Sequence, residues 1–518
     1  MNNTVKTTDE KPDGHQGVTQ RAAILMAANV IATALSFALP LVLVRTMSQP
    51  EYGLYKQAFQ IVLSAMMLLN LQVAVSVFYF MAREPGKKLQ VALNVMLFYG
   101  MVGALVLLVF LSWPGWVTLI FKGSDLVPHI PLLGLVILSW LVSTNLEGVP
   151  IAAGDVRVAS VLIVASQSTK AIAMIIAALL FGNLTSILVA AMIQGVIQTA
   201  FMAYYLRRRF GRFLAAFDWP LFKAQIGNAL PFGVGGIVAI VQNDMHNYFV
   251  SHYFDPADFA IYSVGCFQVP LIGMLSTSFA SALNPDLARH KEAGDYRAIL
   301  RLWVDVMHKL ALFSVPVFAL LLVMRHEFIT VLFTATYAAS APIFAINLFT
   351  LLIWITMHLH LLRLFDQLRY FRLKLYLALI PVTLGVLYAG WLAGGMIGVA
   401  VAAVSMQTLD IGTTLLMIGR ELGMTWRDLR LLSPQLRIYA ATMVAALPTL
   451  MVTLVLTAYT PLARLIAGTM IFGLVYLIAI FAIGAVTREE QAQLRAMASK
   501  YHAKWILRKG TGVSEQPI

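Results

Sequence analysis

The sequence predicts an all-α polytopic membrane protein with about 14 transmembrane helices. Of its 518 residues, 60% are hydrophobic and 12% are charged, whereas a soluble domain carries about 25% charged residues. The mean hydropathy is +0.80, and runs such as VALNVMLFYGMVGALVLLVF reach the ~20 residues that a membrane-spanning helix requires. These observations exclude a soluble globular protein. They also exclude an outer-membrane barrel, whose strands alternate polar and apolar residues.

Apolar runs bounded by charged residues, glycine or proline predict fourteen spans in chain order. The first six lie near residues 22–44, 56–81, 91–113, 130–153, 158–182 and 184–206. After a basic, partly amphipathic stretch, six more lie near 228–252, 260–284, 302–324, 342–364, 373–393 and 396–419. A final pair lies near 436–457 and 463–485.

The distribution of basic residues predicts the orientation of these spans. Of the 37 lysines and arginines, 30 lie in the two tails and in alternate loops, and 5 lie in the opposite loops. Cytoplasmic loops carry an excess of basic residues, so we expect both termini to be cytoplasmic. The same distribution accounts for the net charge of +13 without nucleic acid as a partner, because the charge is spread over short loops.

Two short motifs recur six spans apart, in the same order. Glu51–Tyr55 matches Asp258–Tyr262 at an offset of 207 residues, and Val117–Phe121 matches Ile329–Phe333 at an offset of 212. Six is an even number of spans, so the matches predict duplicated halves in the same orientation, an arrangement found in transporters. The alternative is an inert bundle or scaffold. The predicted divisions are a cytoplasmic tail (1–21), an N-lobe (22–206), a linker (207–227), a C-lobe (228–419), spans 13 and 14 with their preceding loop (420–485), and a basic cytoplasmic tail (486–518).

Three segments carry a resemblance to a known family: LVRTMSQPEYGLYKQAFQI, YFDPADFAIYSVGCFQVPLIGMLSTSFASALNPDLAR and FITVLFTATYAASAPIFAI. Together they resemble the polysaccharide flippase branch of the multidrug/oligosaccharidyl-lipid/polysaccharide (MOP) exporter superfamily, which includes O-antigen and exopolysaccharide repeat-unit flippases. The resemblance implies two six-helix lobes, here with two extra helices, in a bacterial inner membrane. It also implies that an undecaprenyl-diphosphate-linked oligosaccharide is moved to the periplasmic leaflet, with a polysaccharide polymerase and export machinery as partners.

Lys170 is the most informative ionisable residue within a predicted span. A charged side chain in hydrocarbon costs at least ~2.5 kcal/mol, so such residues usually face a cavity or a partner. Gln167 lies three positions earlier and therefore on the same helical face. We expect Lys170 and Gln167 to bind the diphosphate or an acidic sugar in a central cavity. The alternative is an ion pair between Lys170 and Glu147, which is itself a candidate for ion or proton coupling.

Other polar residues within spans extend this candidate site. Span 7 carries Asp244, His246 and Asn247 in its outer half, where they could contact sugar or, alternatively, lie at the membrane interface. Arg363, at the end of span 10, could bind phosphate from the cytoplasmic side or simply follow the positive-inside rule. Asp410 in span 12 has no evident partner in the sequence and is a second candidate for ion or proton coupling.

The sequence contains no motif that requires a cofactor. It lacks a Walker A motif, HExxH, GxSxG and clustered Cys/His ligands, so we predict no nucleotide, metal or other cofactor and a secondary transporter rather than an enzyme. Three rival functions remain. A cation-coupled multidrug antiporter of the prokaryotic branch typically has an acidic residue in span 1, which is absent here. A lipid II flippase would share a cationic cavity, and a polysaccharide polymerase or ligase would favour long periplasmic loops, which are missing.

Overall fold

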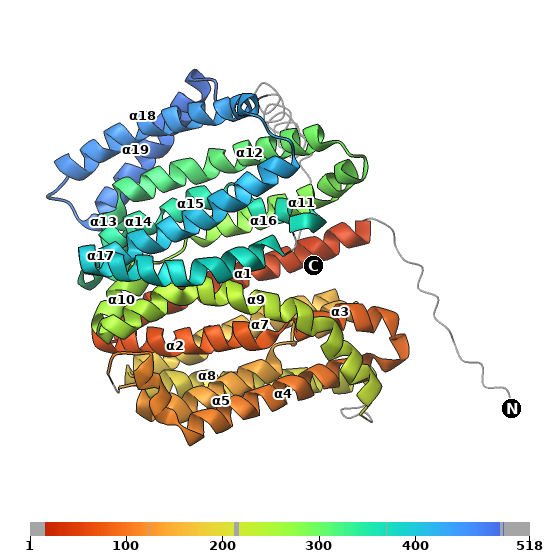
Figure 1. The fold of residues 1–518 in the computed structure, drawn as a ribbon. Helices are drawn as coiled ribbons and strands as arrows, with labels where there is room; N and C mark the ends of the chain where they lie inside the picture. The colour runs from red at the N-terminus through yellow and green to blue at the C-terminus, as the bar shows by residue number, and fades with distance from the viewer. Residues whose placement is uncertain (1–15, 124, 212–216, 369, 487–490, 492–518) are drawn as a thin grey trace, which may run out of the picture. The chain divides into compact units, whose positions relative to one another are not determined.

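The computed structural model describes residues 16–123, 125–211, 217–368, 370–486 and 491. All regular elements in these ranges are helices (Figure 1). Eleven helical stretches of the described chain are long and apolar enough to cross a membrane. The prediction of an all-helical polytopic membrane protein is therefore confirmed.

The fourteen predicted spans all fall on segments that are largely helical, but two of them share one element. The 51-residue helix α17 (Phe371–Glu421) contains predicted spans 11 and 12, and its backbone leaves the helical conformation at Gly394 and Gly395. Gly395 has a φ of +56°, a left-handed value that glycine adopts without strain. A Cβ atom on Gly398 would lie 1.9 Å from the carbonyl oxygen of Gly390, so the two arms approach in backbone contact. The total of fourteen spans stays a prediction.

The chain divides into two compact units, which are described separately. Unit 1 covers the described residues of Met1–Phe267, Leu332–Phe344 and Tyr370–Asp410. It contains residues 371–410 of α17 and the following elements: α1 (Gln16–Thr46), α2 (Gln49–Asn70), α3 (Val73–Arg83), η1 (Pro85–Lys87), α4 (Lys88–Ser112), η2 (Pro114–Leu119), η3 (Val127–His129), α5 (Ile130–Ser143), α6 (Gly148–Ala152), α7 (Val156–Phe181), α8 (Leu184–Phe210), α9 (Trp219–Tyr253), α10 (Pro256–Gly265) and η4 (Ala335–Ser340).

Unit 2 covers the described residues of Gln268–Val331, Ala345–Arg369 and Ile411–Ile518. Its elements are the last part of α17 (411–421) together with α11 (Pro270–Glu292), α12 (Tyr296–Val323), α15 (Phe349–Trp354), α16 (His358–Leu362), η5 (Asp366–Leu368), η6 (Trp426–Leu432), α18 (Ser433–Val455) and α19 (Pro461–Ala482). Two short helices, α13 (Arg325–Phe333) and α14 (Ala341–Asn347), run along the chain from one unit into the other.

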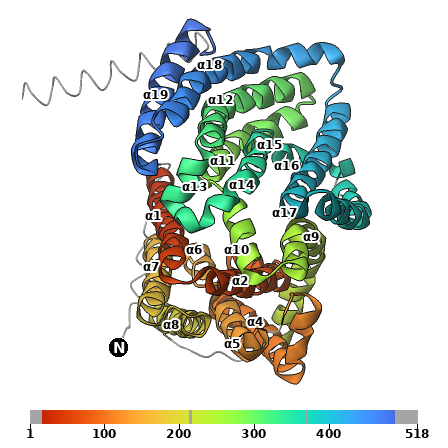
Figure 2. The same cartoon turned by 90° about the vertical axis from the view of Figure 1, so that its left-hand side faces the viewer.

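Within unit 1 the long helices pack in neighbouring pairs. α1 lies along α7, α4 lies along α5, and α5 and α7 both contact α8 (Figure 2). Helix starts follow capping chemistry: the Ser48 hydroxyl accepts a hydrogen bond from the Glu51 backbone N–H at 3.4 Å, and the Asn183 side chain accepts one from the Ser186 N–H at 2.9 Å. Such caps satisfy N–H groups that have no partner within the helix.

The helices that carry the two copies of the first repeated motif pack against each other. One copy begins in the first turn of α2 and the other lies on α10. The Gln49 side-chain amide donates a hydrogen bond to the Ala257 carbonyl at 3.1 Å. A Cβ atom on Gly53 would lie 1.7 Å from the carbonyl oxygen of Pro256. Only glycine allows so close an approach at this position.

The copies of the second motif make reciprocal contacts. After the first copy, the Lys122 N–H donates to the Ser251 carbonyl of α9 at 2.8 Å. In the second copy, the Leu332 carbonyl accepts from the Arg45 guanidinium of α1 at 2.8 Å. α1 and α9 carry the first spans of the two predicted halves. Within the first copy, the Phe121 ring lies 5.9 Å from the Tyr248 ring of α9, measured between centroids. Each copy therefore contacts the helix that begins the other half.

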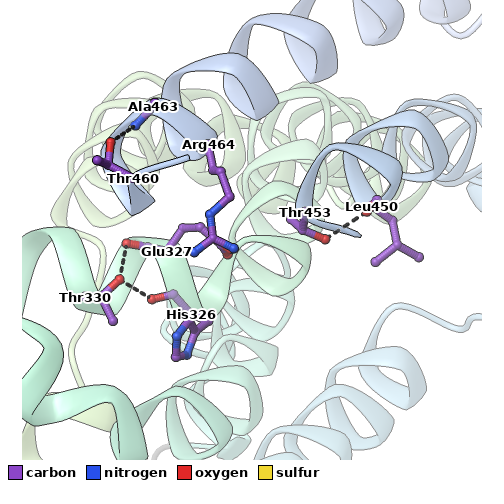
Figure 3. Close-up of polar contacts among 8 residues, drawn as sticks. All are labelled: His326, Glu327, Thr330, Leu450, Thr453, Thr460, Ala463 and Arg464. Atoms are coloured by element: carbon purple, nitrogen blue, oxygen red, sulfur yellow. Dashed lines mark hydrogen bonds and ion pairs between the residues drawn. The ribbon is translucent and has the colours of Figure 1, made fainter. Parts of the chain in front are cut away.

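In unit 2, the hairpin of α18 and α19 packs on α12. The Tyr476 hydroxyl of α19 donates to the Leu312 carbonyl of α12 at 2.9 Å. At the other end of α19, Arg464 forms an ion pair of 3.0 Å with Glu327 of α13, whose side chain is only 5% exposed. Figure 3 shows the two side chains directed toward each other, with Thr460 capping the start of α19. This ion pair attaches α19 to the neighbouring helix.

Candidate functional site

Unit 1 contains a cavity of about 320 Å³. Its walls come from helices that are distant in sequence, namely α1, α2, α7, α9 and α10. The lining residues are Ser36, Leu39, Pro40, Tyr55, Lys56, Phe59, Gln60, Leu63, Gln167, Lys170, Ala171, Met174, Asn247, Phe259, Ser263 and Cys266. We refer to it below as the two-lysine cavity.

One face of α7 brings Gln167 and Lys170 to this cavity, as their spacing in the sequence predicts. The Lys170 Nζ atom lies 4.3 Å from the ring centroid of Trp140, a cation–π distance. The Trp140 indole N–H donates to the Ala191 carbonyl at 2.9 Å, which fixes the ring. The Ser36 hydroxyl donates to the Gln167 side chain at 3.2 Å. The polar face of α7 is therefore held in place from both sides.

The alternative role for Lys170, an ion pair with Glu147, is not found in the described part of the chain. The ion pairs of these residues do not include one between Lys170 and Glu147. Glu147 lies half-buried at the start of α6 and does not line the two-lysine cavity. The ammonium group of Lys170 thus contacts an aromatic ring rather than that carboxylate.

Lys56 lines the cavity but is not among the site residues predicted from the sequence. The predicted span begins near residue 56, and Lys56 is counted among the five basic residues of the loops opposite the termini. In the structure α2 begins seven residues earlier, at Gln49. Lys56 therefore lies inside the helix, lines the cavity, and has its Nζ atom 5.4 Å from the Tyr52 ring centroid. The signal was present in the sequence: Ser48 followed by proline and Glu51 is a helix start.

The three candidates of span 7 divide between the cavity and its surroundings. α9 stays helical to Tyr253, so the polar run does not end the helix. Asn247 lines the cavity. Asp244, one turn earlier, accepts a hydrogen bond from the Ser64 hydroxyl at 2.9 Å. His246 Nδ1 lies 2.9 Å from the Tyr262 hydroxyl oxygen. Of the three, Asn247 alone is among the lining residues.

The structure does not bring Arg363 or Asp410 to the two-lysine cavity. Arg363 is exposed and belongs to unit 2. Asp410 is buried, and its carboxylate lies 3.9 Å from the Arg372 guanidinium on the other arm of α17. Arg372 also donates to the Tyr376 hydroxyl at 2.7 Å. Asp410 thus has a partner that the sequence did not reveal, because 38 residues and the turn at Gly395 separate the two.

The chemistry of the cavity suits an anion that carries hydroxyl groups. Among its described lining residues, two lysines supply positive charge and none is Asp or Glu. The amides of Gln60, Gln167 and Asn247 can donate and accept hydrogen bonds, as sugar hydroxyls require. Tyr55 and Phe59 add flat apolar surface beside these groups. The described residues include no group of three or more His, Cys, Asp or Glu side chains that could hold a metal ion.

Comparisons with known proteins agree on the class of protein. The family described as "Polysaccharide biosynthesis protein" matches residues 18–291. No curated protein matches the sequence significantly. The family match covers more than half of the chain.

Solved structures of membrane transporters share the fold. The inward closed conformation of the lipid II flippase MurJ is similar with a TM-score of 0.64 at 14% identity, covering 87% of this chain and 97% of that one. An inward-facing multidrug resistance MATE family transporter gives 0.58 at 14% identity, covering 75% and 94%. A MOP superfamily transporter from Pyrococcus furiosus gives 0.52 at 12% identity, covering 79% and 96%. At such identities the likeness establishes a MOP-like fold.

Proposed function

We propose that this chain, which belongs to the polysaccharide biosynthesis protein family, is a flippase for an undecaprenyl-diphosphate-linked oligosaccharide repeat unit. It has the fold of MOP superfamily transporters, which is consistent with a transporter that is not an enzyme. The proposal places it in a bacterial inner membrane with both termini cytoplasmic. There it moves the repeat unit to the periplasmic leaflet for surface polysaccharide synthesis, upstream of a polymerase and export machinery.

The observation that carries this proposal is the composition of the two-lysine cavity. A diphosphate-linked sugar needs positive charge for its phosphates and amide or hydroxyl groups for its sugars. Lys56 and Lys170 supply the first, while Gln60, Gln167 and Asn247 supply the second. A transporter for cationic drugs would instead need acidic side chains, and the described lining has none.

The cavity also lowers the barrier to moving a charged group through a membrane. An anion in hydrocarbon loses its hydration, so translocation needs fixed positive charge within the protein. In the proposed step, the ammonium groups of Lys170 and Lys56 contact the diphosphate while the proximal sugar binds the amides. The lipid tail stays in the bilayer. Rearrangement of the surrounding helices then opens the cavity to the opposite side, as in alternating access.

We further propose fourteen spans in two parallel six-helix lobes, residues 22–206 and 228–419, followed by a helix pair. The reciprocal contacts of the repeated motifs support this, because each copy of the second motif contacts the first helix of the other half. The glycine-lined turn of α17 supports two spans in that single element. Glu147 and Asp410 are proposed for ion or proton coupling, and Asp410 would have to leave Arg372 to act.

The test is deletion of the gene, with an assay of surface polysaccharide and of undecaprenyl-linked oligosaccharide in the inner leaflet. We expect loss of polymer with accumulation of completed repeat units on the cytoplasmic side. Re-expression of the wild-type chain should reverse both effects. Re-expression of a Lys309→Ala chain should reverse both effects as well. This lysine also lies within a span, but it is paired with Asp305 at 2.6 Å.

Other outcomes would each overturn the proposal in a specific way. Normal polymer with new sensitivity to drugs would indicate a multidrug antiporter. Accumulation of lipid II with a cell-wall defect would indicate a lipid II flippase. Repeat units that reach the periplasm without being polymerised would indicate a polymerase or ligase.

A further inference from the structure

A second concave surface lies on unit 1, between α7 and α8. It is a groove of about 720 Å³, and it lies where α7 begins and α8 ends. The lining residues are Asp155, Arg157, Val158, Val161, Leu162, Ala165, Phe201, Tyr204, Tyr205, Arg208 and Arg209. We call this surface the α7–α8 groove.

The groove uses the face of α7 opposite to the two-lysine cavity. Val158, Val161, Leu162 and Ala165 follow helical spacing along one side of α7. At 100° per residue, the cavity residues Gln167 to Met174 lie on the other side. Val161 on this side of α7 is 66% exposed. The groove therefore has an apolar wall that the described protein does not cover.

The polar end of the groove carries more positive charge than its own carboxylate can neutralise. Asp155 is occupied: its Oδ2 atom accepts from the Arg209 Nε at 2.8 Å and from the Tyr205 hydroxyl at 2.7 Å. Within the described chain, Arg208 donates to a neutral group, the Tyr204 hydroxyl, at 3.2 Å. Among the described residues, neither Arg157 nor Arg208 has a carboxylate within ion-pair distance. Two guanidinium groups are thus available beside an apolar wall.

We propose that the α7–α8 groove binds an anionic glycerophospholipid of the leaflet that faces the N-terminal end of α7. The guanidinium groups of Arg157 and Arg208 bind the headgroup phosphate, to which arginine presents paired N–H donors. The acyl chains lie along the valines of α7 and Phe201. Basic pockets between membrane helices on the cytoplasmic side are suited to such headgroups. The bound lipid stabilises the position of α7, whose opposite face carries Lys170.

Charge complementarity favours this occupant over a zwitterionic lipid. A phosphatidylcholine headgroup brings its own cation next to the phosphate and gains little from two arginines. An anionic headgroup has no internal cation and gains from both. The proposal does not depend on the flippase function, because it concerns a surface that does not include the two-lysine cavity.

The test compares lipid retention by the purified full-length protein and by R157A/R208A. Native mass spectrometry measures the co-purified phospholipids, and thermal unfolding is followed with added phosphatidylglycerol or phosphatidylcholine. We expect the wild type to retain anionic lipid and to gain thermal stability with phosphatidylglycerol only. In R157A/R208A, retention should fall about tenfold or more, as expected from removing two basic residues beside an anionic headgroup.

Two further variants separate the groove from general charge and folding effects. R301A/R420A removes two exposed arginines elsewhere on the described chain and should retain lipid as the wild type does. R157K/R208K keeps the charge but not the paired donors, so it should retain an intermediate amount of lipid and fold normally. Equal retention by wild type and R157A/R208A would overturn the proposal. So would equal stabilisation of the wild type by both lipids, or recovery of an undecaprenyl-linked diphosphate in place of a glycerophospholipid.

Discussion

Two cations within membrane-spanning helices have opposite environments. In unit 1, Lys170 lies in the two-lysine cavity against the Trp140 ring, with no carboxylate in ion-pair distance among the described residues. In unit 2, Arg464 lies 3.0 Å from Glu327, and both side chains are largely buried, at 15% and 5% exposure. The paired charge joins two helices, whereas the charge without a carboxylate faces a cavity. The difference distinguishes a structural ion pair from the candidate ligand site.

The energetics of burial explain why these arrangements have different uses. An ion pair removes most of the penalty of placing charge away from water, so Arg464 and Glu327 satisfy each other. A cation–π contact contributes about 2 kcal/mol when desolvated, and it leaves the charge of the lysine without a counter-ion. The positive charge of Lys170 is therefore not neutralised, and an anion that enters the cavity can neutralise it.

Replacing Lys170 should cause the largest loss of function. We expect Lys170→Ala to abolish polysaccharide export, or to reduce it by at least about a hundredfold, because a buried charge-assisted contact to the diphosphate is lost. Protein abundance in the membrane should stay normal. Export is measured as surface polymer per amount of flippase, with Lys309→Ala as the control. A normally abundant Lys170→Ala protein with full export would remove this residue from the site.

Breaking the Glu327–Arg464 pair should reduce stability rather than transport chemistry. Glu327→Gln leaves Arg464 buried without a counter-charge, which costs on the order of 3 kcal/mol. We expect a lower thermal unfolding temperature and lower abundance, with unchanged export per folded molecule. The double variant Glu327→Leu/Arg464→Met, which removes both charges, should recover most of the stability. If the double variant exports nothing although it folds, the pair has a role beyond attachment.

Replacing the second lysine of the cavity should reduce export less than replacing Lys170. Lys56 is nearer the start of its helix than Lys170 is, and it stands beside Tyr52 at 5.4 Å. We expect Lys56→Ala to reduce export by about tenfold, the effect of one weaker charged contact, with normal abundance. Lys56→Arg should restore part of the activity. Export at the wild-type level in Lys56→Ala would reduce the two-lysine cavity to a site with one essential lysine.

Replacing Asp410 should have the smallest effect, and the replacement tests whether this carboxylate is structural or takes part in ion coupling. Its distance of 3.9 Å from Arg372 is long for an ion pair, so Asp410→Asn, which keeps a polar side chain, should cost about 1–2 kcal/mol of stability, less than Glu327→Gln. If the carboxylate is structural, export by Asp410→Asn keeps its dependence on the ion gradient. Loss of that dependence in reconstituted vesicles, at normal stability, would instead assign Asp410 to coupling.

Much of the architecture could be predicted because it follows from local properties of the chain. A membrane-spanning helix requires a run of apolar residues, and such a run is visible without knowing its neighbours. The predicted spans accordingly fall on largely helical segments, and Gln167 and Lys170 share a helical face as their spacing requires. Span boundaries were less accurate, because hydropathy does not register a helix that starts with polar residues. That error assigned Lys56 to a loop.

Partners across the fold were decided by tertiary structure alone. Glu327 and Arg464 are 137 residues apart, and Arg372 and Asp410 are separated by the turn of α17. Helical periodicity gives the direction in which a side chain leaves the axis of its helix. It does not identify the neighbouring helix that the side chain faces. Whether a cation in a span is neutralised or available therefore depends on packing between distant helices. Apolar runs and charge placement in this sequence determine a polytopic helical membrane protein, while helix packing makes Lys170 a cavity residue and Arg464 a structural one.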